Sequence, residues 1–219
     1  MRVAVIGIGG IGGPYGASLA KAGADVTFVA RGAHLRAMQK DGLRLEGDRG
    51  EILVRPAQAT DDIAGIGAVD YVLLCVKLWD VESAGEQIRP ITGPATAVVP
   101  LQNGVDAAER LIPILGRAAV MGATAFVTGS IVAPGVVRQT GTYQQMTFGD
   151  LDGGASPRGE RLRDLCAAAI TVNPASRNTA AITARSPPSS PTTRIVGRVP
   201  AMASFASLPV SPTSLSTES

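Results

Sequence analysis

A glycine-rich stretch near the N-terminus has the spacing of a phosphate-binding loop. It consists of Gly7, Ile8, Gly9, Gly10, Ile11 and Gly12. It follows an apolar, strand-like segment and opens a helix-like one, which is the context that makes this spacing informative. In such a loop the first glycine permits a tight turn, the second lets a pyrophosphate approach the backbone, and the third lets helix and strand pack closely. The free N–H groups of the helix start then bind phosphate oxygens. The alternative is a glycine-rich turn that binds no ligand.

A basic residue, Arg31, comes at the end of the next apolar segment, 25–30. An NAD site usually has Asp or Glu near this position, where it binds ribose hydroxyls. Arginine suits a 2′-phosphate instead, through a charge-assisted hydrogen bond of about 1.5–3 kcal/mol. That energy corresponds to a roughly 10- to 150-fold preference for NADP over NAD. The alternative is an exposed arginine near a helix start.

Two further polar residues follow apolar segments. Lys77 comes after the segment 69–76, and Asn103 comes after the segment 96–102. Each has a simpler interpretation, because lysine is common on protein surfaces and Asn-Gly is common in turns. We nevertheless predict that both lie in the same ligand site as the glycine loop.

The elements that must position these residues alternate between strands and helices. We expect strands at 2–6, 25–30, 69–76 and 96–102, helices at 11–22, 32–41, 80–89 and 105–115, and two short strands around a polar turn in 42–56. This alternation predicts an α/β fold of the Rossmann type, with a doubly wound, mostly parallel sheet and helices on both faces. The loops after parallel strands lie along one edge of the sheet, so the glycine loop, Arg31, Lys77 and Asn103 are expected to line one crevice.

Beyond residue 118 the pattern changes, and we expect shorter strands that finish the sheet. The predicted nucleotide-binding domain spans 1–156. Residues 157–170 have the period of an amphipathic helix, and 157–172 are assigned to the start of a second domain. The apolar face of this helix is then expected to be exposed if that domain is missing, which favours aggregation or a homodimer. The apolar face of this helix consists of Leu162, Leu165, Cys166, Ala169 and Ile170.

The segment 173–219 has a different composition. Nearly half of its residues are Ser, Thr or Pro, and Glu218 is its only acidic residue. Such a composition is typical of a disordered tail. The other interpretation is a reading-frame shift near 167–175, which translation of the other frames of the source DNA would test.

Bulk composition excludes several function classes. The net charge of +2 is too small to indicate a nucleic-acid or membrane partner. Cys75, Cys166 and the single histidine, His34, have no metal-ligand spacing, so we expect no metal, and His34 is expected on the surface. The N-terminus lacks the apolar run of about 7–15 residues of a secretory signal, so a cytoplasmic protein is expected.

The motifs together resemble the ketopantoate reductase (2-dehydropantoate 2-reductase) family. The resemblance rests on GIGGIGG with Arg31, CVKLWD around Lys77, LQNGVD around Asn103, and the later GATAFVTGSIVAPGVVRQTG. It implies reduction of 2-dehydropantoate, a 2-oxo acid, to pantoate with NADPH in pantothenate biosynthesis. It also implies an all-helical second domain, which in this chain is truncated or disordered. By this resemblance Gly7 to Gly12, Arg31, Lys77 and Asn103 bind NADP, and Asn103 also contacts substrate.

The resemblance leaves the catalytic residue unassigned. The family's proton-donating lysine lies in the helical domain, whereas this chain has only Lys21, Lys40 and Lys77. Two alternatives to an active reductase therefore stay open. One is a non-catalytic NADP-binding module or fragment, and the other is a related NADP-dependent reductase of a different 2-oxo acid.

Overall fold

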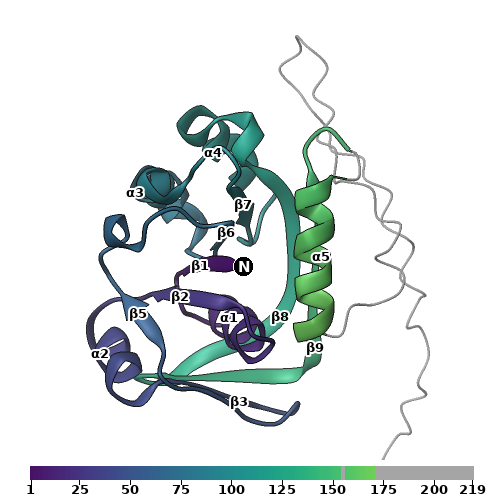
Figure 1. Cartoon of the computed structure of the whole chain (residues 1–219). Coiled ribbons are helices and arrows are strands. Elements are labelled where there is room, and N and C mark those ends of the chain that lie inside the picture. The colour runs from purple at the N-terminus through teal and green to yellow at the C-terminus, as the bar shows by residue number, and fades with distance from the viewer. Residues whose placement is uncertain (154–155, 171–219) are drawn as a thin grey trace, which may run out of the picture. The chain divides into compact units, whose positions relative to one another are not determined.

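Five parallel strands form the first sheet of the structure, a computed structural model that describes residues 1–153 and 156–170 (Figure 1). The strand order is β5-β2-β1-β6-β7, and every neighbouring pair is parallel. This order confirms the predicted doubly wound sheet. The strand β5 is short and partly polar, and the sequence did not predict it. The bounds are β1 Arg2–Ile6, β2 Asp25–Val29, β5 Gln58–Thr60, β6 Tyr71–Leu74 and β7 Ala97–Pro100.

Helices cover both faces of this sheet, as predicted. Alternate residues of a strand point to opposite faces, so Val3 and Val5 pack with α1 and α2, whereas Ala4 and Ile6 pack with α3 and α4. In the described part of the chain, no helix is long and apolar enough to cross a membrane. The helices are α1 Gly12–Lys21, α2 Gly32–Asp41, α3 Val81–Ile88 and α4 Ala107–Leu115, with short 3-10 turns η1 Ala64–Ile66, η2 Leu78–Asp80, η3 Arg89–Ile91 and η4 Arg117–Ala119.

A second sheet corrects the prediction for the region after residue 118. The chain there forms two long antiparallel strands, β8 Met121–Ala133 and β9 Val136–Asp150, rather than short strands that finish the first sheet. They join β3 Leu43–Gly47 and β4 Ile52–Val54 in the order β4-β3-β9-β8. The helix α1 packs against strands of both sheets (Figure 1). The hairpin therefore covers a helix face that would otherwise be exposed, and this burial favours one long curved hairpin.

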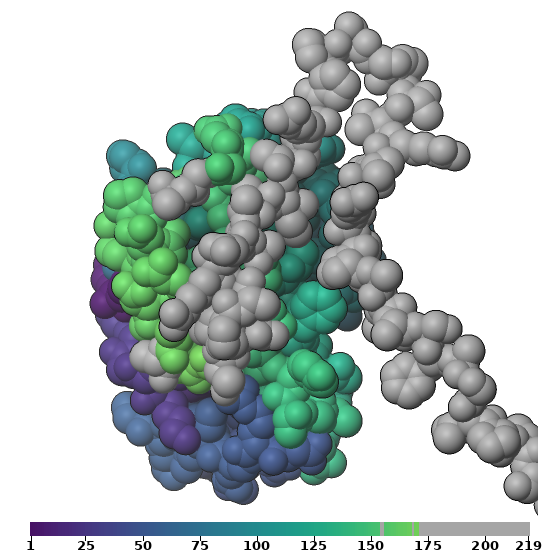
Figure 2. Space-filling model, turned by 90° about the vertical axis from the view of Figure 1, so that its right-hand side faces the viewer, coloured from purple at the N-terminus to yellow at the C-terminus, as the bar shows by residue number. Residues whose placement is uncertain are grey.

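The predicted amphipathic helix is α5, Pro157–Ala169. The Ser156 hydroxyl accepts a hydrogen bond from the Gly159 N–H at 3.1 Å, which caps its N-terminus. Its apolar face belongs to the core cluster that contains α1, and Leu162 is fully buried there. The expectation of an exposed apolar face was therefore wrong. Figure 2 shows the outer side of α5, in green, as part of the molecular surface.

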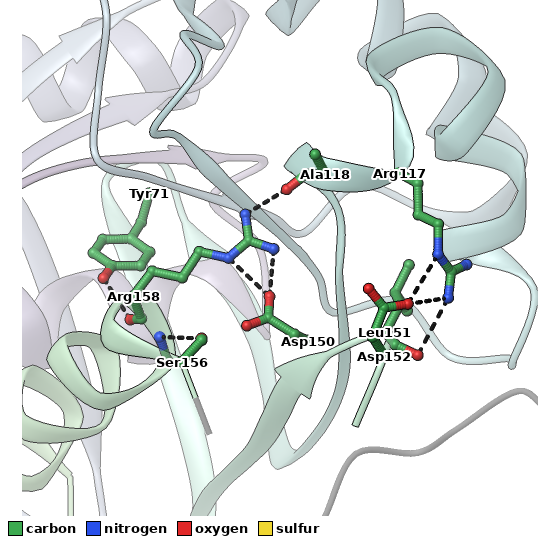
Figure 3. Close-up of polar contacts among 9 residues, drawn as sticks. Tyr71, Arg117, Ala118, Asp150, Leu151, Asp152, Ser156 and Arg158 are labelled. Carbon is green, nitrogen blue, oxygen red and sulfur yellow. Dashed lines mark hydrogen bonds and ion pairs between the residues drawn. The ribbon is translucent and has the colours of Figure 1, made fainter. Parts of the chain in front are cut away.

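Polar contacts fix the N-terminal end of α5 to the strands (Figure 3). The Arg158 guanidinium forms an ion pair with Asp150 at the end of β9 and also donates to the Ala118 carbonyl. The Tyr71 hydroxyl donates to the carbonyl oxygen of Arg158 at 2.7 Å. A neighbouring ion pair, Arg117 with Asp152, is open to solvent, and the Asp152 side chain is 85% exposed. The two carboxylates therefore differ mainly in burial.

Replacing Asp150 by alanine is expected to lower the free energy of unfolding by about 1–3 kcal/mol. The side chains of Arg158 and Asp150 are 21% and 17% exposed, so the substitution leaves a mostly buried cation without its carboxylate. Asp152→Ala is the matched control and should change the same quantity by about 0–1 kcal/mol, because its pair is solvated. Urea denaturation monitored by circular dichroism measures both. Equal effects of the two substitutions would contradict this account.

Candidate functional site

The loops that follow four strands lie side by side along one edge of the first sheet. The Gly7 N–H donates to the Val29 carbonyl at 3.1 Å, which joins the ends of β1 and β2. A Cβ on Gly7 would lie 3.2 Å from the Cys75 carbonyl, and one on Gly104 would lie 3.3 Å from the Leu78 side chain. The loops after β1, β2, β6 and β7 are thus neighbours, as predicted. The strand order reverses between β1 and β6, which is where this class of sheet binds ligands.

The glycine loop has an open side and a closed side. A Cβ on Gly9 would meet no heavy atom within 4 Å. A Cβ on Gly12 would lie 2.2 Å from the Gly7 carbonyl oxygen, so helix and strand could not pack this closely with any other residue there. The first turn of α1 has neither an acidic residue nor a side-chain cap. The loop therefore offers backbone N–H groups beside free space, which fits a pyrophosphate.

Gly10 has a neighbour that the sequence did not reveal. A Cβ on Gly10 would lie 1.9 Å from the carbonyl oxygen of Gly129, in the middle of β8. The second sheet thus packs directly on the glycine loop. The Ile8 side chain is buried in the core, and that of Ile11 packs partly buried against it. A ligand of this loop would therefore contact both residues mainly through the backbone.

The three predicted polar residues are all exposed along this edge. Arg31 precedes α2, and its Nη2 donates to the Gln87 Oε1 at 3.1 Å. Lys77 precedes η2, and Asn103 lies in the loop between β7 and α4. The structure therefore brings the predicted residues to one edge, with their polar groups toward solvent.

Gln102 is a residue of this edge that sequence reasoning missed. Its Nε2 donates to the Leu74 carbonyl at 2.7 Å, which ties the loop after β7 to the end of β6. Its Oε1 is buried and has no hydrogen-bond partner among the described residues. The sequence signal that could have identified Gln102 is its position next to Asn103. An unpaired buried acceptor costs free energy unless a ligand or water completes it.

His34 also lies at this edge, and the prediction of a surface histidine was wrong. The side chain is half-buried, because the turn between β8 and β9 packs on it. The Gly135 N–H donates to its Nδ1 at 2.9 Å. Its Nε2 is buried, and no hydrogen-bond partner is present in the described part of the chain. No local signal identifies this contact, because Gly135 is 101 residues away in the sequence.

Comparisons with known proteins agree with this geometry. Residues 3–153 match the family model described as "Ketopantoate reductase PanE/ApbA". The 2-dehydropantoate 2-reductase of Mesorhizobium japonicum is 34% identical over 179 residues, covering 72% of this chain and 54% of that protein. The enzyme of the same name from Archaeoglobus fulgidus is 33% identical over 177 residues, covering 78% of this chain and 56% of that protein.

A solved structure of a 2-dehydropantoate 2-reductase is also similar to this chain. The crystal structure of 2-dehydropantoate 2-reductase from Porphyromonas gingivalis W83 is similar to this chain with a TM-score of 0.75 and 35% identity. The similarity covers 79% of this chain and 63% of that one. The chain spans about half the length of the curated relatives that it matches. The fold, the arrangement of the glycine loop and these matches together show that the chain belongs to the ketopantoate reductase family.

Proposed function

We propose that residues 1–156 bind NADP and that the full-length protein reduces 2-dehydropantoate to pantoate, a step of pantothenate biosynthesis. The observation that carries the proposal is the open space at Gly9, beside an uncapped helix start at the reversal point of the sheet. Membership of the ketopantoate reductase family supports the substrate. A second domain that starts at 157–172 stays a prediction, and 173–219 lie outside the described residues.

Residues of this chain would bind the phosphate groups of the cofactor. The start of α1 presents backbone N–H groups and the positive end of the helix dipole to a pyrophosphate. Arg31 now makes one hydrogen bond to the neutral Gln87 amide. Exchange of that bond for a charge-assisted bond to a 2′-phosphate is favourable, because bonds between charged groups are about twice as strong. These contacts would select NADP over NAD.

When bound, NADPH supplies a hydride to a ketone carbon. Negative charge then develops on the ketone oxygen, and a nearby cation or proton donor stabilises it. Lys77 places an ammonium group on the edge that holds the glycine loop, and Asn103 places an amide there that can donate to a substrate oxygen. The proton donor that the family resemblance implies lies in the second domain. No lysine follows Lys77 in this chain, and that favours a non-catalytic NADP-binding module as the second candidate.

A titration separates the two candidates. The purified 219-residue chain is titrated with NADPH by fluorescence, and 2-dehydropantoate is then added while the absorbance of NADPH is followed. Binding with turnover supports a reductase that these residues form by themselves, and binding without turnover supports an NADP-binding module that needs further residues for catalysis. Absence of NADPH binding would refute both.

Arg31→Ala is expected to weaken NADPH binding by roughly 10- to 150-fold and to leave NADH binding little changed. The substitution removes a charge-assisted bond that only the 2′-phosphate can accept. Fluorescence titrations with both nucleotides measure the effect. Arg36→Ala, at an exposed position of the same helix, is the control and should change neither affinity. Equal losses for NADPH and NADH in Arg31→Ala would exclude a 2′-phosphate contact.

A further inference from the structure

The β8–β9 hairpin contacts the glycine loop region at two separate places. In the middle of β8, the Gly129 backbone packs against Gly10 so closely that no side chain fits between them. At the tip of the hairpin, Gly135 has φ +77° and donates its N–H to His34, which is on the first turn of α2. The Gly135 carbonyl in turn accepts from the Arg44 N–H at 2.9 Å. The hairpin is thus fixed at its tip as well as over the loop.

The imidazole of His34 connects this tip to the glycine loop. Its Nδ1 accepts the hydrogen bond from Gly135, and its Nε2 is buried without a hydrogen-bond partner among the described residues. The backbone of Ile8 lies close enough to the imidazole to act on its pKa. One side chain therefore lies between the second residue of the predicted phosphate-binding loop and the turn of the second sheet. A shift of either segment would change its contacts with the other.

The hydrogen bond from Gly135 determines the protonation state of His34. Because Nδ1 accepts a hydrogen bond, it must carry a lone pair, and the ring proton of the neutral form is then on Nε2. Burial lowers the pKa of His34 below its ordinary value, and the Ile8 backbone offsets part of this effect. Protonation would place an N–H on Nδ1 opposite the N–H of Gly135. The observed contact therefore requires the neutral imidazole.

We propose that His34 is a positioning residue that, as a neutral imidazole, holds the β8–β9 turn and the dinucleotide loop in the arrangement that binds NADP. The proposal rests on the proposed function, because it concerns the same cofactor site. It predicts that cofactor affinity falls when His34 is protonated. The turn would then leave His34, and the loop would lose a support at Ile8.

Other charged groups around His34 do not account for a fall in NADP affinity at low pH. The loop 7–11 and the turn 133–135 contain no titratable side chain. On β9, Arg138 is paired with Glu46 at 2.9 Å. On α2 itself the neighbouring charges are Arg31 and Arg36. Histidine is the side chain whose ordinary pKa lies between pH 5 and 8.

Two substitutions of His34 separate positioning from general stability. An asparagine at this position retains an acceptor near the place of Nδ1 but cannot be protonated at neutral or mildly acidic pH, whereas a leucine offers no acceptor. NADP⁺ binding to the full chain and to the variants His34→Asn and His34→Leu is measured by calorimetry from about pH 8 down to about pH 5, around the usual pKa of histidine. Arg36→Asn is the exposed control on the same helix. Thermal unfolding of every variant is recorded in parallel.

At high pH we expect His34→Leu to bind NADP⁺ on the order of tenfold more weakly, because the buried Gly135 N–H loses its acceptor. His34→Asn should bind like the wild type. As the pH falls through the pKa of His34, which burial places below the usual value of about 6.5, the wild type should lose affinity relative to His34→Asn, by at most about tenfold per pH unit. Protonation of the 2′-phosphate affects all variants alike and cancels in this ratio.

Two results would overturn the inference while leaving the proposed function intact. One is a set of parallel pH profiles for the wild type and His34→Asn. The other is a His34→Leu variant with a lower unfolding temperature and unchanged NADP⁺ affinity, which would show a purely structural role. A wild type that binds no NADP⁺ at high pH would instead refute the proposed function, and this inference with it.

Discussion

Replacing Gly10 by alanine is expected to lower the free energy of unfolding by about 1–3 kcal/mol and to weaken NADP binding. The new Cβ would lie 1.9 Å from the Gly129 carbonyl oxygen and 2.4 Å from its carbon. Both contacts are with backbone, so the glycine loop or the β8–β9 hairpin must move. Thermal unfolding and a calorimetric titration with NADP⁺ measure the two effects.

Gly9→Ala is the matched control for this substitution. It adds the same methyl group one residue earlier in the same loop, where no atom lies within 4 Å. We expect an unfolding temperature near that of the wild type but an NADP⁺ affinity at least about tenfold lower, because the methyl group occupies the space through which a pyrophosphate approaches the backbone. If Gly9→Ala binds NADP⁺ normally, the phosphates do not bind on this side of the loop. If Gly10→Ala unfolds like the wild type, the hairpin is not packed on Gly10 as described.

Leu162→Ala is expected to lower the free energy of unfolding by about 2–5 kcal/mol. The leucine side chain has no exposed surface, and its cluster includes residues of α1 and of both sheets. Removal of its methyl groups therefore leaves a cavity in the main core. The expected loss is large, because the free energy of unfolding of a whole protein is only about 5–15 kcal/mol. Chemical denaturation gives the change from the shift in midpoint at constant slope.

Arg163→Ala is the control for Leu162→Ala, because it changes a residue of the same helix, α5, without leaving a cavity in the core. Its guanidinium is half-exposed and pairs with the adjacent Asp164, so the substitution should change stability by no more than about 0.5 kcal/mol. A Leu162 variant as stable as the Arg163 variant would mean that α5 is not part of this core. The helix would then belong to a separate second domain, as the sequence alone suggested.

The regular part of the fold could be predicted because its signals are local. Buried parallel strands are nearly continuous apolar runs, and Gly42 and Gly116, which follow α2 and α4, have positive φ angles. The helices and strands up to residue 115 therefore lie within a few residues of their predicted positions, β5 excepted. Convergence of the glycine loop, Arg31, Lys77 and Asn103 followed from strand order alone.

The hairpin could not be predicted in the same way, because its partners are distant in sequence. Its strands alternate small inward residues such as Ala123 and Ala125 with polar or exposed ones such as Phe126, a pattern that fits a short strand as well as a long one. Its register against β3 pairs Leu45 with Val137, and nothing near either residue specifies this. The contacts of Gly10 and His34 depend on the same pairing, so the predicted site lacked them.

The packing of β8 on Gly10 has a consequence for the order in which the chain becomes functional. The glycine loop leaves the ribosome before the β8–β9 hairpin, yet its neighbour Gly129 and the partner of His34 belong to that hairpin. Contacts between such distant segments form slowly, because a large loop must close first. A nascent chain that ends before β8 would already contain every predicted nucleotide-binding residue. It would not contain the β8–β9 hairpin, whose backbone packs on the glycine loop. The glycine loop therefore reaches its working arrangement only after the β8–β9 hairpin, which follows it by more than a hundred residues, has formed.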